Sequence, residues 1–262
     1  MRALWRGAVT FGLVTIPVRL FGATEQHNFE FHQVHRVDGG RVRHRKVCEV
    51  CDQEVGADAI ARGYELEDGR LVQLDQEDFD RLPLASERNI EVVEFVSVDQ
   101  VDPIYLHKSY YLEPDRSSVQ PYVVLRDALE RAWRLAIVKI TIRRRETLAV
   151  VRPRGGVLVL HTLLWPDEIR EPWFDFLGAG VEPRRQEVRM ATSLVNTMTG
   201  VFDPGEFTDD YREAVERLIL AKSSGAEIPV ARAAEETGGM DLLTALRRSL
   251  DEVRASRDDA DR

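Results

Sequence analysis

Cysteine is scarce in this chain, and long apolar runs are missing from it. Only two of the 262 residues are cysteines, Cys48 and Cys51, and in a chain without a secretory signal this fits a reducing cytoplasm. No stretch approaches the roughly 20 apolar residues of a membrane-spanning helix. Charged residues and Pro17 interrupt the apolar segment 1–21, and no small-residue cleavage site follows it, so we expect no signal peptide. These absences predict a cytoplasmic protein without a membrane partner.

The common catalytic motifs are absent as well. The chain has no G-x-x-x-x-G-K-[ST] loop, no G-x-G-x-x-G after a strand, no H-E-x-x-H and no G-x-S-x-G. Its carboxylates are scattered over solvated stretches, and its six histidines have no nucleophile in a recognisable context. The sequence therefore predicts a binding protein rather than an enzyme, with no cofactor.

Charge is distributed unevenly along the chain. Taken alone, the net charge of -9 argues against an anionic partner. Residues 58–102, however, hold thirteen acidic residues and four arginines, whereas residues 126–156 hold nine basic and three acidic residues. Local field rather than net charge steers a polyanion. These counts are compatible with two arrangements. One is an ordinary mixed surface, and the other is an acidic exterior around a basic lining that holds nucleic acid.

The first two thirds of the chain have the patterns of β-strands. Residues 14–21 alternate with a period of two, and residues 9–13 alternate in the opposite phase, so we expect a bend or bulge near Gly12. Asp68-Gly69 stands between two short runs in GYELEDGRLVQL, which is a strong hairpin signal.

Further strand candidates are residues 89–98 and 105–112. Three more runs, LAIVKITIR, TLAVVRP and GVLVLHTLLW, are joined by RRE and RGG, which predicts an antiparallel meander. A barrel is the economical closure for so many strands, so the predicted fold class is mainly β with α.

Elsewhere the apolar period becomes helical. One predicted helical face comprises Tyr122, Leu125, Leu129 and Ala132 or Trp133. A second helix is predicted over 188–198, and a third is expected to have Thr208 as its N-cap and Gly225 at its end. Residues 225–239 are typical of a linker. The short amphipathic helix predicted over 242–253 either folds back on the domain or binds a partner, because isolated helices of this length are marginal in water.

The stretch RVRHRKVCEVC, residues 41–51, sets four positive charges beside both cysteines. A zinc site would need two more ligands; His32 and His35 could supply them, or two subunits could pool their cysteine pairs. A thioredoxin-like redox pair should begin a helix, but the surroundings here are β and loop. We favour the third interpretation, a structural turn after a basic strand, and we predict no metal site.

On a strand, Arg41, Arg43 and Arg45 would share one face at a spacing of about 6.6–6.8 Å, close to the phosphate repeat of DNA. A solvated strand face would explain one such cluster, but arginines in the meander repeat the pattern. No aromatic platform for single strands is evident, which favours duplex DNA. The predicted DNA-contacting residues are Arg41, Arg43, Arg45, Lys46, Arg143, Arg144, Arg145, Arg152 and Arg154.

With these segments in place, the chain resembles the bacterial Ku proteins of DNA end joining. The resemblance runs from residue 1 to about 225 in the family's order and spacing. It is carried by MRALWRGAVTFGLVTIPVRLF, FHQVHRVDGGRVRHRKVCEVC, GYELEDGRLVQL, VDPIYLHKSYYLEPD, GGVLVLHTLLWPDEIREP and MATSLVNTM. Six stretches in order make the similarity specific at family level.

The resemblance implies a Ku-type β-barrel core with DNA-encircling bridge strands and a helical C-terminal arm. It assigns 1–184 to the core and bridge, 185–225 to an arm for dimerisation, and 226–262 to a linker, short helix and polar tail. It further implies a homodimeric ring on double-stranded DNA ends, recruitment of an ATP-dependent DNA ligase, and a location in the cytoplasm with the nucleoid. Some relatives carry a Lys-rich tail, whereas this chain ends in RASRDDADR, which leaves tail-mediated DNA retention in doubt.

Two rival functions remain open from the sequence. A sequence-selective regulator that binds internal duplex sites would bind covalently closed circles. A metal-dependent nuclease would need acidic side chains around a cation and would lose activity in chelator. The Ku-like interpretation differs from both. A closed ring contacts phosphates rather than base edges, and DNA can enter it only at an end of the duplex.

Overall fold

The computed structural model describes residues 1–82, 88–143, 145–226 and 243–251. The chain divides into two units, Met1–Glu171 and Pro172–Arg262, which are described one at a time. Arg144 is among the residues outside the described ranges, as are the greater part of the predicted linker and the last eleven residues.

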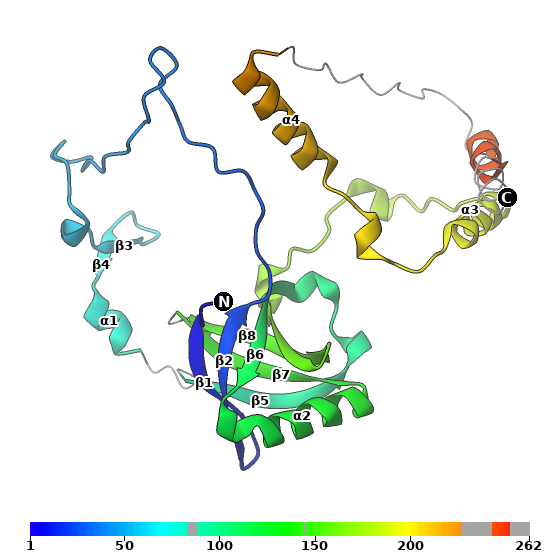
Figure 1. The fold of residues 1–262 in the computed structure, drawn as a ribbon, viewed down its shortest axis with the longest axis horizontal. Coiled ribbons are helices and arrows are strands. Elements are labelled where there is room, and N and C mark those ends of the chain that lie inside the picture. Colours follow the sequence, from blue (N-terminus) through cyan, green and yellow to red (C-terminus); the bar gives the residue numbers. More distant parts are fainter. Residues whose placement is uncertain (83–87, 144, 227–242, 252–262) are drawn as a thin grey trace. The chain divides into compact units, whose positions relative to one another are not determined.

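The first unit is built around a closed seven-stranded barrel with the order β1-β2-β6-β9-β8-β7-β5 (Figure 1). Neighbouring strands are antiparallel except β1 and β5, which close the barrel in parallel. The predicted barrel and the predicted meander of its last three strands are thereby confirmed. The strands are β1 Trp5–Phe11, β2 Val14–Gly22, β5 Asn89–Ser97, β6 Leu106–Pro114, β7 Arg134–Ile142, β8 Arg145–Arg154 and β9 Val157–Leu163.

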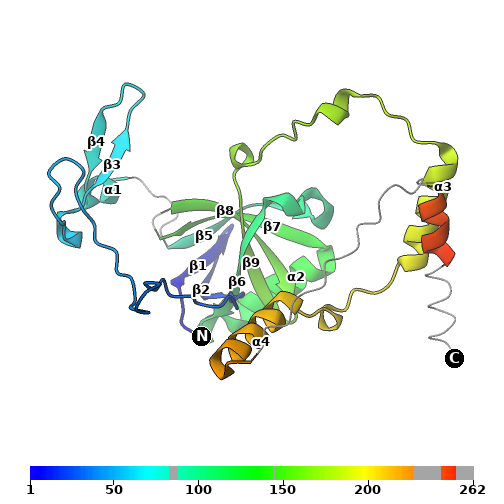
Figure 2. The ribbon, with the colours of Figure 1, turned by 90° about the horizontal axis from the view of Figure 1, so that it is seen from above.

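Alternating side chains fill the barrel interior, as the period of two requires. Figure 2 shows the strands curving around this interior. The core residues with less than 2% exposure include Ile16, Val18, Leu20, Ile90, Leu112, Val138, Ile140, Leu158 and Leu160. Close packing of these branched side chains fixes which face of each strand points outward, and therefore which arginines reach solvent.

The opposite phases of residues 9–13 and 14–21 have a simpler cause than the predicted bend. β1 and β2 form a hairpin in which Phe11 pairs with Val14, leaving a loop of Gly12 and Leu13. Gly12 has φ +56, which suits glycine at the first position of a two-residue hairpin loop. The chain therefore changes direction near Gly12, as predicted, but it does so in a hairpin turn rather than in a bend or bulge.

Helix α2, Val119–Ala132, packs against the barrel through Tyr122, Leu125 and Leu129, as its period predicts. The hydroxyl of Tyr122 donates a 2.6 Å hydrogen bond to the carbonyl of Leu112 in β6 and accepts one of 2.6 Å from the backbone N–H of Leu158 in β9. Trp133 does not continue the face. It takes a left-handed conformation at the helix end and is 78% exposed.

Residues 23–88 leave the barrel between β2 and β5. Within them, β3 Arg62–Glu65 and β4 Leu71–Leu74 pair as the predicted hairpin, with Gly69 at φ +81 in its loop, and helix α1 Gln76–Asp80 follows. Within the described residues, the short 3₁₀ turns are η1 Ala57–Ala59, η2 Val98–Gln100, η3 Pro103–Tyr105, η4 Arg116–Ser118, η5 Pro166–Glu168, η6 Asp175–Gly178 and η7 Pro204–Glu206.

The second unit is helical, with α3 Arg185–Met198, α4 Asp210–Ser224 and a helical stretch at 243–251. The N-cap of α4 is Asp209, whose carboxylate accepts from the backbone N–H of Arg212 at 2.9 Å. The prediction of Thr208 is wrong by one residue, and its hydroxyl instead donates to Asp210. Gly225 ends α4 with φ +70, as predicted.

Candidate nucleic-acid interface

The basic stretch before the cysteines is exposed but is not a strand. Arg41 forms an isolated bridge with Val34, and residues 42–46 have no regular secondary structure. The predicted arrangement of three guanidinium groups on one strand face is therefore wrong, because no neighbouring strand holds these residues flat. Arg45 pairs with Glu54 at 3.3 Å. Arg41, Arg43 and Lys46 have no acidic partner within the described part of the chain.

The two cysteines lie in a tight turn closed by the bridge between Val47 and Glu54. Its backbone bonds run from Cys48 N–H to Gln53 O at 2.9 Å and from Asp52 N–H to Cys48 O at 2.8 Å. The N–H groups of Cys51 and Val50, followed by the Cys51 thiol, lower the pKa of the Cys48 thiol. Both cysteines are free. These bonds give the stretch the form of a structural turn.

The proposed histidine ligands do not join the cysteines. His35 Nδ1 lies 2.9 Å from Asp38 Oδ2 in a separate small turn. Among the residues described, no three His, Cys, Asp or Glu side chains come together to hold a metal ion. A zinc site made by His32 and His35 with the cysteines of the same chain is therefore not formed, whereas pooling of cysteines between two chains stays untested.

The barrel arginines divide between the two ends of one strand. Arg145 begins β8, and Arg154 ends it; at about 3.3 Å per residue the two backbones are about 30 Å apart. Arg143 lies in the loop just before β8, and Arg152 near its far end. Lys139, in the neighbouring strand β7, pairs with Glu146 at 3.4 Å. The predicted set is therefore not one cluster, because strand length separates residues that are close in sequence.

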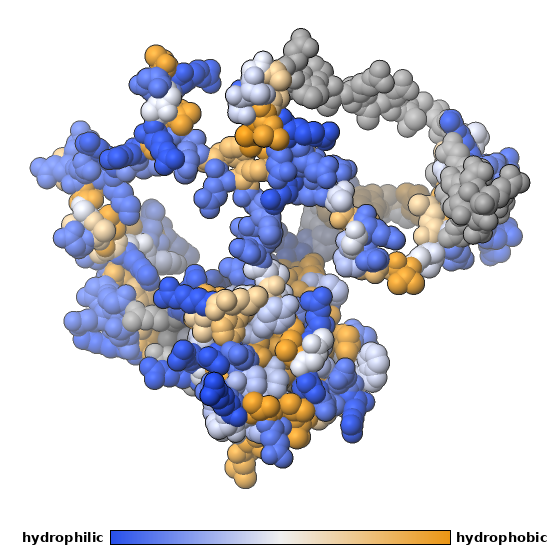
Figure 3. Space-filling model, in the orientation of Figure 1, coloured by the Kyte–Doolittle hydropathy of each residue, from blue (hydrophilic) through white to orange (hydrophobic). Residues whose placement is uncertain are grey.

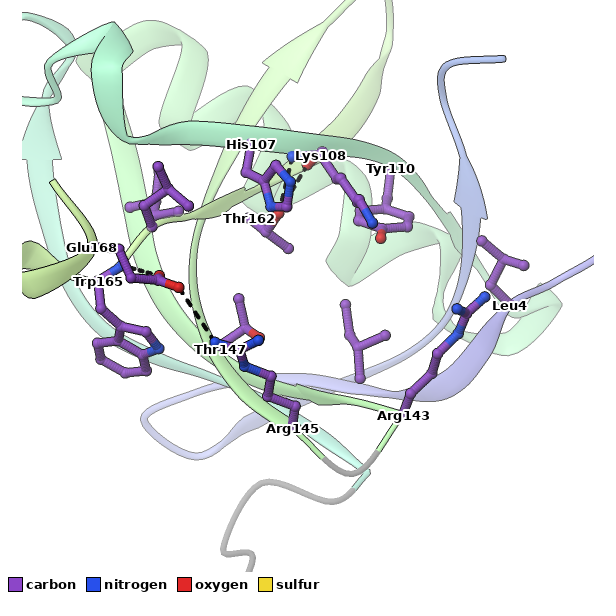
Figure 4. Close-up of a pocket in the computed structure, with 13 residues that line it drawn as sticks. Leu4, His107, Lys108, Tyr110, Arg143, Arg145, Thr147, Thr162, Trp165 and Glu168 are labelled. Carbon is purple, nitrogen blue, oxygen red and sulfur yellow. Dashed lines mark hydrogen bonds and ion pairs between the residues drawn. The ribbon is translucent and has the colours of Figure 1, made fainter. Parts of the chain in front are cut away.

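One end of the barrel holds a cavity of about 360 Å³ that Arg143 and Arg145 share with His107 and Lys108 (Figure 4). Arg145 pairs with Glu168 at 3.3 Å, and Glu168 also accepts from the backbone N–H of Trp165 at 2.8 Å. The remaining lining residues are Leu4, Tyr110, Ile142, Thr147, Thr162, Leu163, Leu164 and Trp165. Sequence reasoning missed Lys108 and His107, since only barrel closure brings β6 opposite the loop before β8.

Arg152 belongs to a hydrogen-bonded chain on the outer face of the barrel. Its Nε–H donates to His161 Nε2 at 2.9 Å. The neutral imidazole then carries its proton on Nδ1, which faces Ser109 Oγ at 2.9 Å. Burial, then Arg152 and Arg154, lower the pKa of His161. Burial, then Arg154, lower the pKa of Arg152. A neutral His161 holds Arg152 by one nitrogen and leaves its two terminal nitrogens for an anion.

No described helix is both long enough and apolar enough to span a lipid bilayer. Residues 10–191 match the family model of the Ku70/Ku80 beta-barrel domain. This range covers the barrel apart from the first five residues of β1, the segment between β2 and β5, and the first turns of α3.

Curated relatives match nearly the whole chain. The non-homologous end joining protein Ku 2 of Saccharopolyspora erythraea is 55% identical over 98% of this chain and 86% of its own length. The Ku proteins of Frankia casuarinae and Streptomyces griseus are 52% and 44% identical over 98% and 99% of the chain. This chain spans 65% and 66% of the length of those two relatives. These matches confirm the resemblance, and with it the prediction of a DNA-repair protein that is not an enzyme. The chain belongs to the bacterial Ku family of non-homologous end joining proteins.

Proposed function

We propose that the protein binds the ends of double-stranded DNA as a homodimeric ring and recruits an ATP-dependent DNA ligase for end joining. The observation that carries this proposal is the match to end-joining Ku proteins over 98% of the chain. On this proposal the protein acts on the nucleoid in the cytoplasm.

Unneutralised basic side chains support contact with a phosphate backbone. Arg41, Arg43 and Lys46 are exposed and lack acidic partners among the described residues, and the same holds for Arg143 and Arg154. Phosphate contacts fix position without reading sequence. Arg144, the remaining candidate in the β7–β8 loop, lies outside the described residues.

Exposed apolar side chains in the second unit support assembly with a second copy. Trp173 is 91% exposed, Phe202 77% and Phe207 69%. Figure 3 shows hydrophobic groups on the visible surface of α4 and of the segment before it. Large aromatic side chains left in water are unfavourable and are typical of interface anchors. On this proposal these aromatic side chains are buried against the partner subunit, and the helices of the second unit bind the ligase.

The test compares linear, nicked and closed-circular DNA of one sequence, with and without chelator. A ring that threads onto ends retains only the linear form and leaves it uncut. Retention of closed circles at a preferred site would instead indicate a sequence-selective regulator, the rival binding function. Chelator-sensitive cleavage would indicate a metal-dependent nuclease.

A further inference from the structure

The cavity at the barrel end has features of a ligand site rather than of a bare phosphate-backbone surface. Mouths of β-barrels are frequent ligand sites, and such sites range from about 300 to 1,000 Å³. With about 360 Å³, this one has room for a single nucleotide-sized group. In Figure 4, Lys108 and Tyr110 face Arg143 and Arg145 across the opening.

The charges that line the cavity match a doubly charged anion. Lys108, Arg143 and Arg145 supply three fixed positive charges, and the single carboxylate of the lining is Glu168. Glu168 pairs with Arg145, which leaves an excess of two positive charges. A phosphomonoester carries about -1.5 to -2 charges at pH 7, whereas a backbone phosphodiester carries only one.

Arg143 occupies a backbone position that favours glycine. Its φ is +51, in a short hairpin loop where glycine or asparagine is the ordinary choice. A non-glycine residue held in this region is strained, and such strain is found mostly at functional sites. The loop thus carries an unfavourable backbone together with a guanidinium aimed at the cavity (Figure 4).

Apolar and aromatic groups complete the cavity. Tyr110 and Trp165 line it together with Leu4 and Ile142. Aromatic faces accept a nucleobase of any sequence, with about 1–3 kcal/mol per stacked base. A basic cluster beside such faces favours a nucleotide over inorganic phosphate alone.

From these observations we infer that the barrel end binds a nucleotide through its phosphomonoester, with Arg143, Arg145 and Lys108 on the phosphate and Tyr110 or Trp165 beside the base. Two sources carry this chemistry: a free nucleoside monophosphate, and the 5′-phosphorylated terminus of a broken strand. For the second source the inference rests on the proposed function.

The first experiment measures binding of AMP and of adenosine to the full chain by calorimetry. The site predicts that AMP binds at least about tenfold more tightly than adenosine, because charge-assisted hydrogen bonds to the phosphate are lost in adenosine. Arg143→Gly removes the cation and relieves the left-handed backbone, so it keeps the fold. We expect it and Arg145→Gln to weaken AMP binding about tenfold each. The matched control is Arg131→Gln, an exposed arginine on α2 outside the cavity, which leaves AMP binding unchanged.

The second experiment compares 5′-phosphorylated and 5′-hydroxyl duplexes of one sequence, together with closed-circular DNA. A preference for the 5′-phosphate that disappears in Arg143→Gly supports the DNA terminus as the source. AMP binding without such a preference supports a free nucleotide.

The inference is overturned if neither probe shows a phosphomonoester preference, or if the preference persists unchanged in both Arg143→Gly and Arg145→Gln. Failure of the proposed function is seen separately. It would show as equal retention of linear and closed-circular DNA by the unmodified chain, whatever the AMP result.

Discussion

The Nε–H of Arg152 donates to Nε2 of His161 across 2.9 Å, so a basic side chain on the barrel is oriented by a neutral histidine rather than by a carboxylate. A carboxylate partner would neutralise the guanidinium, whereas the neutral imidazole leaves its charge for a phosphate. The arrangement depends on His161 staying unprotonated, because a doubly protonated imidazole cannot accept this hydrogen bond.

Stability should therefore fall in weak acid, and His161 should account for part of the loss. Burial and then the neighbouring arginines lower the folded-state pKa of His161 below its unfolded value of about 6.5. Between these two pKa values the unfolded chain binds more protons, so the free energy of unfolding decreases as pH falls from about 6.5 through the folded pKa. In His161→Gln we expect this decrease to be smaller. Urea unfolding between about pH 7.5 and pH 5, a range that brackets the histidine pKa, measures the free energy of unfolding of both proteins. Parallel pH profiles for the two proteins would contradict the assignment.

Tyr122→Phe should destabilise the barrel by about 1–3 kcal/mol. The hydroxyl satisfies the carbonyl of Leu112 and the N–H of Leu158 at 2.6 Å each, and its loss leaves both buried groups without that partner. Burial raises the pKa of this hydroxyl, in keeping with an enclosed site. Chemical denaturation measures the change. The control Tyr64→Phe lies on the exposed hairpin and should stay within about 0.5 kcal/mol of the unmodified protein; equal effects of both substitutions would refute the prediction.

Arg43 and Arg45 should contribute unequally to DNA binding. Arg43→Gln removes a cation that has no acidic partner in the described ranges. If Arg43 contacts a phosphate, the slope of the logarithm of the binding constant against the logarithm of the salt concentration becomes less steep by about 0.9. Arg45 is paired with Glu54 at 3.3 Å, so Arg45→Gln should lower the slope less. Glu54→Gln frees Arg45 and should strengthen binding at low salt. Titrations of a DNA duplex at several salt concentrations measure these slopes. Identical slopes for all three variants and the unmodified protein would show that residues 41–46 are not part of the DNA interface.

Replacing both cysteines should leave the turn intact. Its backbone bonds at Cys48, Asp52 and Val55 do not involve sulfur. Cys48 is half-buried and Cys51 is exposed, and surface substitutions of this kind change stability by about 0.5 kcal/mol or less. We expect Cys48→Ser combined with Cys51→Ser to keep the melting temperature and linear-DNA retention, with and without chelator. A large drop in melting temperature on chelation of the parent protein, absent in the double variant, would show a shared metal instead.

Trp173→Ala should weaken self-association. Truncating a buried aromatic anchor at an interface costs about 2 kcal/mol or more, so the dimer dissociation constant should rise at least about thirtyfold. Sedimentation equilibrium measures it. The control Trp133→Asn removes an exposed tryptophan from the first unit and suits its left-handed backbone. Unchanged association in Trp173→Ala would exclude this side chain from the interface.

Local sequence patterns were sufficient for most of the regular structure. Alternation located the first two strands, short apolar runs located the meander, and Asp68-Gly69 marked a hairpin, because periodicity and turn chemistry are local properties of the backbone. The same reasoning failed at residues 41–46, where alternation of arginine and smaller residues looks like a strand. There, regular pairing requires a neighbouring strand, and the described chain offers Arg41 a single bridge to Val34.

By itself, then, the sequence determined the family, the barrel and the basic character of particular segments, since these follow from residue order and short-range periodicity. Only the tertiary structure decided which cations act together. Barrel closure sets Lys108 opposite Arg143 and Arg145, strand length separates Arg145 from Arg154, and pairing of β8 with β9 brings His161 to Arg152. The physical reason is that side-chain neighbourhoods depend on strand register and closure, which join residues far apart in the chain and have no signature in any one segment.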